Sequence, residues 1–340
     1  MNDNISLRIS FLRIFLIIQV VTIHSYGFFA TPPVKDYIFW TQNYFSNVIA
    51  RPAVPLFFII SAYLLFLKIE RLSIAEYNNN IKKRITTLLI PHILWNLIYL
   101  GIYFIINRTL HYPYPFHFNS FFDTIWGISR EPVAYQFWFI RDLFTLTIFY
   151  PLFYILDKYL GIIVTLILGI LWLFSIPIHL AYIWNESIFF FFVGMQLAKR
   201  KKLLLYNNMF TIPFFFVLSI IDVIGQVLKY ENFVVVHRLT VFVGVVAFWN
   251  ITNWAYSFLV NNKDIIIKFA QLSFGIFVLH QPIMTTFLKK IGIYIATKTS
   301  EHLLLPLYII TIFIAVLTSA QITLFLKKIF PKYNYILLGK

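Results

Sequence analysis

The sequence predicts an all-α fold, a polytopic transmembrane helical bundle with about ten membrane-spanning helices. Of its 340 residues, 60% are hydrophobic and only 12% are charged, whereas soluble domains carry about 25% charged residues. The hydrophobic residues gather into runs close to the roughly 20 residues that one helical crossing of a bilayer requires. The length allows about ten such crossings with short loops, so we expect residues 1–340 to form one transmembrane domain without a separate soluble domain.

The first apolar segment, near residues 11–31, predicts a retained span and not a cleaved signal peptide. It is long enough to cross a bilayer, and it carries Arg13, Gln19 and His24 within the apolar run. The longest loop, residues 107–136, is expected on the outer face as a lid or an acceptor-binding segment. The other apolar runs predict spans near residues 52–69, 86–106, 137–156, 160–179, 187–198, 211–228, 234–259, 265–288 and 303–326.

Lysine and arginine set the expected orientation. They cluster after the second span, after the sixth at residues 199–202, and at the end of the chain. Cytoplasmic loops of membrane proteins retain such residues, and ten spans return the chain to its starting side, so both termini are expected in the cytoplasm. The net charge of +15 follows from the same rule, and we expect no nucleic-acid partner. Three lysines depart from it, because this topology places them outside: Lys289, Lys290 and Lys298.

The absence of cysteine removes whole classes of chemistry. It excludes disulfides, thiolate metal sites and a cysteine nucleophile. No glycine-rich phosphate loop, fixed-period repeat or Gly-x-Ser-x-Gly segment occurs. His111 and His117 share no helical spacing with a carboxylate, so no metal site is expected. Any reaction must then rely on His, Asp, Glu, Ser, Thr, Tyr, Lys or Arg side chains.

Arg13 and His24 are the ionisable residues of the first span. They stand eleven residues apart, which at about 1.5 Å per helical residue separates them by roughly 16 Å near one face of the helix. A charged group inside a bilayer is costly without a partner or a wet cavity, so such residues indicate function. The alternatives are a histidine that only packs against a neighbouring helix and an arginine that extends to the membrane interface.

Five segments, in order along the chain, resemble one protein family. They are Leu12-Arg13 with His24-Ser25, Pro55-Leu-Phe-Phe-Ile-Ile-Ser-Ala-Tyr63, Lys82-Lys-Arg-Ile-Thr-Thr-Leu-Leu-Ile-Pro91, Phe137-Trp-Phe-Ile-Arg-Asp-Leu143 and Phe274-Gly-Ile-Phe-Val-Leu-His-Gln-Pro282. In these segments the chain is similar to the integral-membrane acyltransferases of acyltransferase family 3. That family O-acylates sugars in bacterial surface polysaccharides and related molecules.

Two positions depart from the pattern usual in that family. Ala62 stands where the family usually has glycine, which affects helix packing more than chemistry. The family often has two basic residues three apart before the third span, but here Thr87 follows Arg84 at that spacing. If this pair grips the acyl donor, Lys82 and Lys83 are expected to supply the second charge.

The resemblance implies a membrane O-acyltransferase in the bacterial inner membrane. It implies transfer of an acyl group, most simply acetyl, from acyl-coenzyme A to a hydroxyl of a surface polysaccharide or lipid-linked glycan of the O-antigen type. Acetyl-coenzyme A is then a substrate, and no bound cofactor is expected. His24 is the expected base and Arg13 its catalytic partner. The cations expected to bind the donor are Arg13, Lys82, Lys83 and Arg84.

Four further residues are candidates for binding or orienting the acceptor: Trp138, Arg141, Asp142 and His280. Consecutive helical residues point about 100° apart, so Arg141 and Asp142 are expected not to pair with each other but to find partners elsewhere. Asp142 could orient His24 or bind a sugar hydroxyl, and a purely structural ion pair is the alternative. Aromatic residues in this region, Trp126 and Tyr135 included, fit sugar stacking or an ordinary interfacial belt.

Two other functions also fit a bundle of this kind. One is a transporter or flippase for a lipid-linked sugar, with Arg13 and His24 lining its route, although no paired broken helices stand out. The other is a polysaccharide polymerase, which also fits many spans with one long outer loop. A change in glycan chain length, without added acyl mass, would distinguish the polymerase from an acyltransferase.

Overall fold

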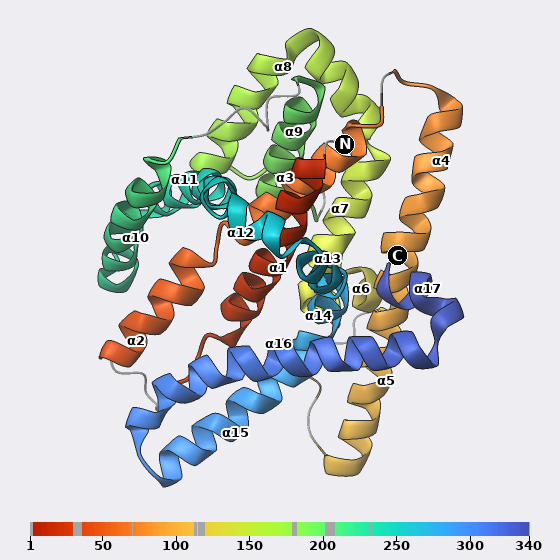
Figure 1. The fold of residues 1–340 in the computed structure, drawn as a ribbon. Helices are drawn as coiled ribbons and strands as arrows, with labels where there is room; N and C mark the ends of the chain where they lie inside the picture. Colours follow the sequence, from red (N-terminus) through yellow and green to blue (C-terminus); the bar gives the residue numbers. More distant parts are fainter. Residues whose placement is uncertain are drawn as a thin grey trace.

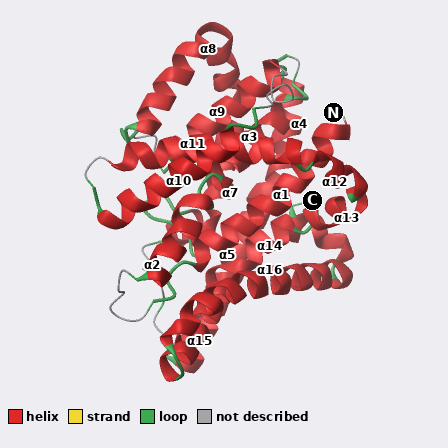
Figure 2. Cartoon of the chain, turned by 60° about the vertical axis from the view of Figure 1, so that its left-hand side comes forward, coloured by secondary structure: helices red, strands yellow, loops and turns green. Residues whose placement is uncertain are grey.

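The computed structural model describes residues 3–29, 36–69, 71–111, 114, 120–178, 182–200, 208–230 and 233–339. Within these ranges every regular element is a helix and no strand occurs (Figure 2). The prediction of an all-α fold is therefore confirmed. Four residues considered in the sequence lie outside the described residues: His117, and Lys201, Lys202 and Lys340 of the basic clusters.

The helices follow one another along the chain in a simple order, in which η denotes short 3₁₀ or π-helical turns. They are α1 (Asp3–Ser25), α2 (Tyr37–Gln42), η1 (Asn43–Ile49), α3 (Ala53–Phe66), α4 (Ile74–Arg84), η2 (Ile85–Leu89), α5 (Ile90–Leu110), α6 (Phe121–Trp126), η3 (Tyr135–Phe137), α7 (Trp138–Ile148), α8 (Tyr150–Leu173), α9 (Asn185–Arg200), α10 (Thr211–Leu228), α11 (Phe233–Trp254), α12 (Tyr256–Asn261), α13 (Lys263–Ala270), α14 (Ser273–Leu279), η4 (His280–Met284), α15 (Thr285–Lys298), η5 (Glu301–Leu303), α16 (Leu304–Ile329), η6 (Pro331–Tyr333) and α17 (Asn334–Leu338).

Eight continuous helical segments of the described chain are long and apolar enough to cross a membrane. They are α1, α2 to α3, α4 to α5, α8, α10, α11, α13 to α15, and η5 to α16. The shorter helices α7 and α9 lie among them with most of their side chains buried. A polytopic transmembrane bundle is therefore confirmed, and α7 and α9 together with the eight longer segments correspond to the ten apolar runs.

Helix α8 turns over near its middle. Leu160 has a non-helical backbone (φ −133°, ψ 22°), and Figure 1 shows α8 arching at the top of the molecule. The kink therefore separates the predicted spans 137–156 and 160–179. The first comprises α7 and the start of α8, and the second corresponds to the rest of α8. Asp157 in the arch pairs with Lys199 at the end of α9, with 2.9 Å between Oδ2 and Nζ.

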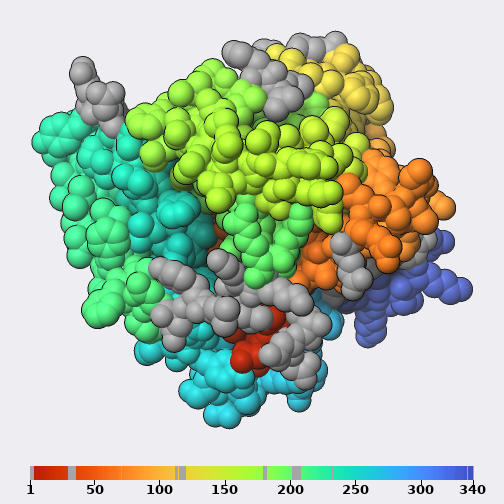
Figure 3. Space-filling view, turned by 90° about the horizontal axis from the view of Figure 1, so that it is seen from above, coloured from red at the N-terminus to blue at the C-terminus, as the bar shows by residue number. Residues whose placement is uncertain are grey.

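Helix α1 runs through the middle of the bundle (Figure 1), in contact with α3, α13, α16 and η1. Its start reaches the surface on the face seen in Figure 3. The helix begins and ends earlier than the predicted span 11–31. Gly27, two residues after its end, has a φ of +107°, a left-handed conformation that glycine adopts readily and that does not continue a helix.

The segment before α3 was missed from sequence, because polar residues interrupt its apolar run ahead of the predicted span 52–69. In the structure these side chains are satisfied inside the bundle. Gln42 accepts from the Phe28 amide at 2.9 Å and donates to the Phe28 carbonyl at 2.7 Å. Ser46 lies 2.8 Å from the hydroxyl of Tyr308. Internal hydrogen bonds thus allow α2 and η1 to extend the second span.

Helices α3 and α9 pack closely along their lengths. A Cβ atom added at Gly194 would contact the backbone of Ile59 and lie 3.0 Å from the Cβ of Ala62. The missing side chain at Gly194 therefore permits the close approach of the two helices. Since α9 supplies this glycine, Ala62 can stand where related proteins usually have one.

The ninth span is longer than the predicted range 265–288, and it is broken. Gln281 has an extended backbone (φ −132°, ψ 161°) between α14 and α15. The break directs the side chains of His280 and Gln281 into the bundle, where both are buried. One of the lysines that depart from the charge rule, Lys289, donates to the Tyr26 carbonyl at 2.7 Å.

The predicted loop 107–136 contains helical structure. Helix α6 lies within it and ends at Gly127, whose φ is +79°. Asp123 accepts from the hydroxyl of Ser129 and from the amides of Ser129 at 2.9 Å and Ile128 at 2.7 Å. The hydrogen bonds from Ser129, followed by the one from Ile128, hold the pKa of the Asp123 carboxyl below its usual value.

Candidate active site

Residues of α1, α3, α7 and α14 line a cavity of about 400 Å³, called the central cavity below. Arg13 and His24 both line it, from opposite halves of α1. Eleven helical residues separate them, which corresponds to roughly 16 Å along the helix axis. The two side chains thus share one face of α1, as their spacing predicts.

Two arginines line the central cavity from different helices. Arg13 is exposed to the cavity, and Arg84, the last residue of α4, is partly buried. Among the described residues neither guanidinium has an acidic partner within ion-pair distance. Two cations without internal counter-charges make this cavity suited to an anionic ligand.

Lys82 and Lys83 precede Arg84 on α4, but they point elsewhere. Both are exposed, and neither lines the central cavity. Their helix lies at the edge of the face seen in Figure 3. Neighbouring helical residues diverge by about 100° each, so only one of the three can face the cavity. The cation that shares the cavity with Arg84 is Arg13, whereas the sequence led us to expect Lys82 and Lys83 to supply the second charge.

His24 lies in the last turn of α1 and keeps part of its surface open to the central cavity. Its Nδ1 atom is 3.1 Å from the hydroxyl oxygen of Tyr135, and the two rings meet edge to face with centres 5.2 Å apart. When Nδ1 donates its proton to that oxygen, Nε2 keeps the lone pair that a general base needs. The orienting partner is thus Tyr135, a residue flagged from sequence only for sugar stacking.

His280 lies beside His24, with ring centres 5.2 Å apart. Its Nδ1 is 3.0 Å from the Ile276 carbonyl and 2.8 Å from the Phe277 carbonyl, so this nitrogen carries a proton. Its Nε2 is buried without a hydrogen-bond partner among the described residues. His280 therefore both caps α14 and adds an unused acceptor to the surroundings of His24.

Two glutamines near His24 were missed from sequence. Gln136 donates to the backbone carbonyl of Gln281 at 2.7 Å, and Gln281 donates to that of His24 at 3.4 Å. The Oε1 atoms of both are buried without partners within the described chain. Gln281 lies within a recognised segment and Gln136 directly precedes one, but an uncharged amide in an apolar run gives no signal comparable to that of Arg13.

A second cavity, of about 640 Å³, begins on the other side of Tyr135 and is called the Tyr135 cavity. Arg130, Glu131 and Lys290 line it together with apolar residues of α5 and α15. Burial raises the pKa of the Glu131 carboxyl, and nearby Arg141 partly opposes that shift. Tyr135 lines this cavity and its hydrogen-bond partner His24 lines the central one, so the bonded pair connects the walls of the two cavities.

A third cavity, of about 630 Å³, is called the tryptophan cavity after three of its lining residues, Trp138, Trp172 and Trp184. Glu186 and Arg238 line it as well. Trp138 also lines the central cavity, so its side chain stands between the two. Of the proposed acceptor residues, Trp138 is the one placed in cavity walls.

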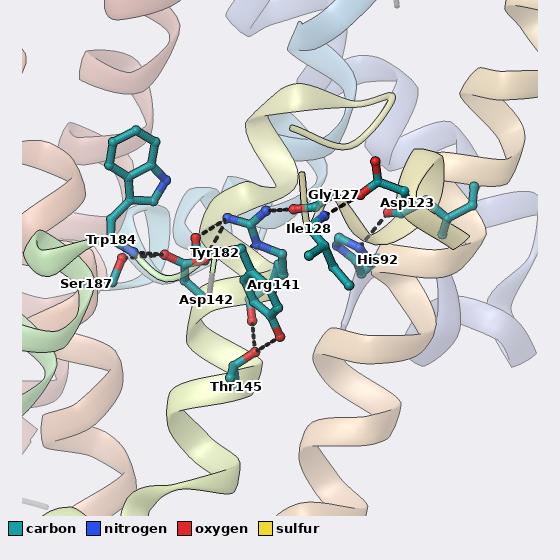
Figure 4. Close-up of polar contacts among 11 residues, drawn as sticks. His92, Asp123, Gly127, Ile128, Arg141, Asp142, Thr145, Tyr182, Trp184 and Ser187 are labelled. Atoms are coloured by element: carbon teal, nitrogen blue, oxygen red, sulfur yellow. Dashed lines mark hydrogen bonds and ion pairs between the residues drawn. The ribbon is translucent and has the colours of Figure 1, made fainter. Parts of the chain in front are cut away.

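Arg141 and Asp142 do pair with each other, contrary to the expectation from helix geometry. The Arg141 Nη2 atom lies 3.0 Å from Asp142 Oδ1, and the two side chains are 3% and 0% exposed. The long arginine side chain folds back along α7 and so overcomes the 100° divergence. Figure 4 shows Arg141 also donating to the carbonyls of Gly127 and Tyr182. Neither residue lines any of the three cavities.

Asp142 accepts further hydrogen bonds from its surroundings. Its Oδ2 accepts from the Ser187 hydroxyl at 2.7 Å and from the Trp184 amide at 3.2 Å (Figure 4). Its Oδ1 accepts from Nε of Arg141 at 3.1 Å. Both carboxylate oxygens are thus occupied, so Asp142 fixes a turn of the chain and has no contact with His24.

No three His, Asp or Glu side chains of the described residues gather in a way that could hold a metal ion. The arrangement instead offers a histidine as base, two arginines for an anionic donor, and unused acceptors near the histidine. Such a set suits transfer between two substrates that meet at His24.

Comparison with known proteins identifies the family of the chain. A family model described as "Acyltransferase domain", that of acyltransferase family 3, matches residues 7–324. The succinoglycan biosynthesis protein ExoH of Rhizobium meliloti (strain 1021) is 25% identical over 305 residues, covering 84% of this chain and 80% of the relative. No solved structure matches the chain significantly. Since the family model covers nearly the whole sequence, the chain belongs to acyltransferase family 3 and is a multi-pass membrane acyltransferase.

Proposed function

We propose that the protein is an O-acetyltransferase of the bacterial inner membrane. Its donor is acetyl-coenzyme A, and its acceptor is a hydroxyl of a surface polysaccharide or lipid-linked glycan. The observation that carries this proposal is the hydrogen bond between His24, which lines one cavity, and Tyr135, which lines another. One cavity contains Arg13 and Arg84, and the other begins at Tyr135, the hydrogen-bond partner of His24.

The central cavity suits the donor. Arg13 and Arg84 can bind the phosphates of coenzyme A, since guanidinium groups bind phosphate through paired hydrogen bonds. The roughly 16 Å along α1 from Arg13 to His24 is comparable with the length of an extended pantetheine arm. The thioester therefore reaches His24 while the phosphates stay with the arginines. Arg13 thus acts in donor binding, and not at the reacting atoms.

The chemistry follows from the tautomer of His24. With its Nδ1 proton donated to Tyr135, Nε2 removes the proton of the acceptor hydroxyl as the sugar oxygen attacks the thioester carbonyl carbon. The new C–O bond forms, the C–S bond breaks, and the imidazolium returns its proton to the departing thiolate. A transient acyl-enzyme on another residue is the alternative route.

The acceptor approaches His24 from the Tyr135 cavity, where Arg130, Glu131 and Lys290 can bind a polar glycan. The name of the relative ExoH, which refers to succinoglycan biosynthesis, supports a polysaccharide acceptor. We place both termini and the basic helix α4 in the cytoplasm, because α4 and the end of α9 carry clustered cations. One transmembrane domain, residues 1–340, then carries out the whole transfer.

The test is mass spectrometry of the surface glycan from cells with the gene deleted, restored, or restored as His24→Ala. We expect the mass of one acetyl group per repeat with the wild type only, with equal membrane levels of both proteins. Purified protein should likewise transfer the radiolabelled acetyl group from acetyl-coenzyme A to glycan from the deletion strain.

An identical glycan mass in all three strains, with a changed amount or chain length, would overturn the proposal. A changed amount would favour transport of a lipid-linked sugar, and a changed chain length would favour polymerisation. A mass difference other than that of acetyl would keep acyl transfer but replace the proposed donor.

A further inference from the structure

The tryptophan cavity combines flat aromatic walls with hydrogen-bonding groups. Trp138 and Trp184 meet edge to face with ring centres 6.2 Å apart. Trp172 donates from Nε1 to Glu186 Oε2 at 3.3 Å, so the carboxylate lies beside the indoles. The volume of about 630 Å³ falls within the roughly 300–1,000 Å³ typical of sites for small organic ligands.

Arg238 brings an unsatisfied donor to this cavity. Its guanidinium carbon lies 5.5 Å from the centre of the Trp172 ring. Its Nη1 atom is buried without a hydrogen-bond partner among the described residues. Leaving such a group unpaired is costly, so a ligand oxygen at this position would be stabilising.

These groups together match a pyranose ring. The face of an indole is electronegative, and it stacks well on the face of a sugar, where several C–H bonds point outward. The hydroxyls at the rim of the sugar can donate to Glu186 and accept from Arg238. An acyl chain would leave these polar groups unpaired, and a phosphate would be repelled by the Glu186 carboxylate.

The buried pair of Arg141 and Asp142 holds one wall of this cavity in place. Asp142 binds the Trp184 amide and the Ser187 hydroxyl, and Arg141 binds the Tyr182 carbonyl (Figure 4). The turn that carries Trp184 is therefore fixed before any ligand arrives, which lowers the entropic cost of binding. In this way Arg141 and Asp142 act as positioning residues for a cavity that they do not line.

The tryptophan cavity adjoins the reaction site through the start of α7. Trp138 lines both the tryptophan cavity and the central cavity. Tyr135, three residues earlier, lines the Tyr135 cavity and bonds to His24. A chain of sugars lying across residues 135–138 would therefore contact Tyr135 with one unit and the tryptophans with another.

We propose that the tryptophan cavity is a subsite for a pyranose unit of the acceptor glycan, adjacent to the unit that is acylated at His24. This rests on the proposed function and deepens it, because it names an oligosaccharide, and not a single sugar, as the acceptor class. Trp184, Glu186 and Arg238 are its recognition residues.

The test uses full-length protein in lipid nanodiscs and the unacylated oligosaccharide repeat isolated from the deletion strain. Binding is measured by calorimetry in the His24→Ala background, where no turnover occurs. Replacing Trp184, which is 55% exposed, leaves the core intact. We expect Trp184→Ala to weaken oligosaccharide binding about tenfold, the loss of one stacking contact, and Arg238→Gln to weaken it similarly. Trp184→Phe should recover part of the affinity.

Trp254→Ala is the matched control, since this tryptophan is 76% exposed at the end of α11 and lines none of the three cavities. With active protein, Trp184→Ala should raise the KM for the oligosaccharide while the KM for acetyl-coenzyme A stays within about twofold. Oligosaccharide affinity equal to that of Trp254→Ala would overturn the subsite. Absence of acetyl transfer by the wild type, with binding still dependent on Trp184, would count against the proposed reaction and leave the subsite standing.

Discussion

Two regions of this bundle contain an arginine inside an apolar helix, and the two arginines differ in whether the protein supplies an acidic partner. Arg13 faces the central cavity, exposed to it and without an acidic partner among the described residues. Arg141 is 3% exposed and binds Asp142 together with two backbone carbonyls. Both residues drew attention in the sequence for the same reason, a charge within a membrane helix.

The difference shows whether the counter-charge of a buried arginine comes from the protein or from a ligand. The charge of Arg141 is balanced inside the protein, so its partners are residues of the chain itself. The charge of Arg13 is not balanced there, so the cavity is electrostatically incomplete until an anion enters. A charge with internal partners indicates structure, and a charge without them indicates a ligand.

The largest expected effect is on stability, from Arg141→Met. It leaves the fully buried Asp142 carboxylate without its counter-ion, which typically destabilises a protein by about 3–5 kcal/mol. Thermal unfolding in nanodiscs should show a large fall in Tm. The double change Arg141→Met with Asp142→Leu should recover much of the loss, because no buried charge remains. A single variant as stable as the wild type would refute a structural role for the pair.

Arg13→Ala should give the reverse pattern. Losing a hydrogen-bonded charge to the donor should raise the KM for acetyl-coenzyme A by about ten- to a hundredfold, while Tm stays near that of the wild type. Arg13→Lys should lie between the two, since it keeps the charge but not the paired hydrogen bonds. If the Tm of Arg13→Ala fell as far as that of Arg141→Met, Arg13 would have a structural role like that of Arg141, and the proposed difference between the two arginines would be wrong.

Arg84 and Lys83 offer a matched pair of neighbouring cations. Arg84 lines the central cavity and Lys83 is exposed outside it. We expect Arg84→Ala to raise the KM for acetyl-coenzyme A about tenfold and Lys83→Ala to change it less than about twofold, because salt screens exposed charges. Initial rates over a range of donor concentrations decide between them, and equal effects would mean that the whole basic helix attracts the donor.

The smallest expected effect is on stability, from a change at Asp123. Its carboxylate accepts hydrogen bonds as that of Asp142 does, but it is not buried inside the bundle. Its pKa is lowered by its bonds to Ser129 and Ile128, so its contribution to stability is present above the unfolded value of about 3.9 and is lost as the pH falls through the folded value. Asp123→Asn should lower Tm by on the order of 1 °C at neutral pH. That difference should shrink below about pH 4, and a difference that grows in acid would contradict the assignment.

Much of the fold could be predicted, because apolar runs of the right length leave few alternatives in a bilayer. The prediction was wrong where polar residues such as Gln42 and Ser46 interrupt a span and are satisfied by distant partners. The predicted break between residues 156 and 160 coincides with the kink of α8 at Leu160, but the sequence did not show that the chain stays helical right up to it on both sides. These departures depend on tertiary hydrogen bonds and packing, which local sequence does not contain.

The site could be predicted in part. Arg13 and His24 were singled out by their charge and spacing, and Trp138 by its segment, and all three line the central cavity. The acceptor atoms of Gln136 and Gln281 were not found, nor was the cavity formed by tryptophans of α7, α8 and the turn before α9. Predicting these features requires knowing which helices lie side by side. An uncharged amide or a single tryptophan is also common in membrane helices without any functional role, so neither is distinctive in the sequence.

The bonded rings of His24 and Tyr135 lie between two separate cavities. Under the proposed topology, one of these cavities takes its ligand from the cytoplasm and the other from the outer side of the inner membrane. A single layer of aromatic side chains then separates the two sides of the membrane at this point. Under the proposed function, the acetyl group would pass across this layer by chemical transfer, so the protein would need no open aqueous pathway that leaks protons.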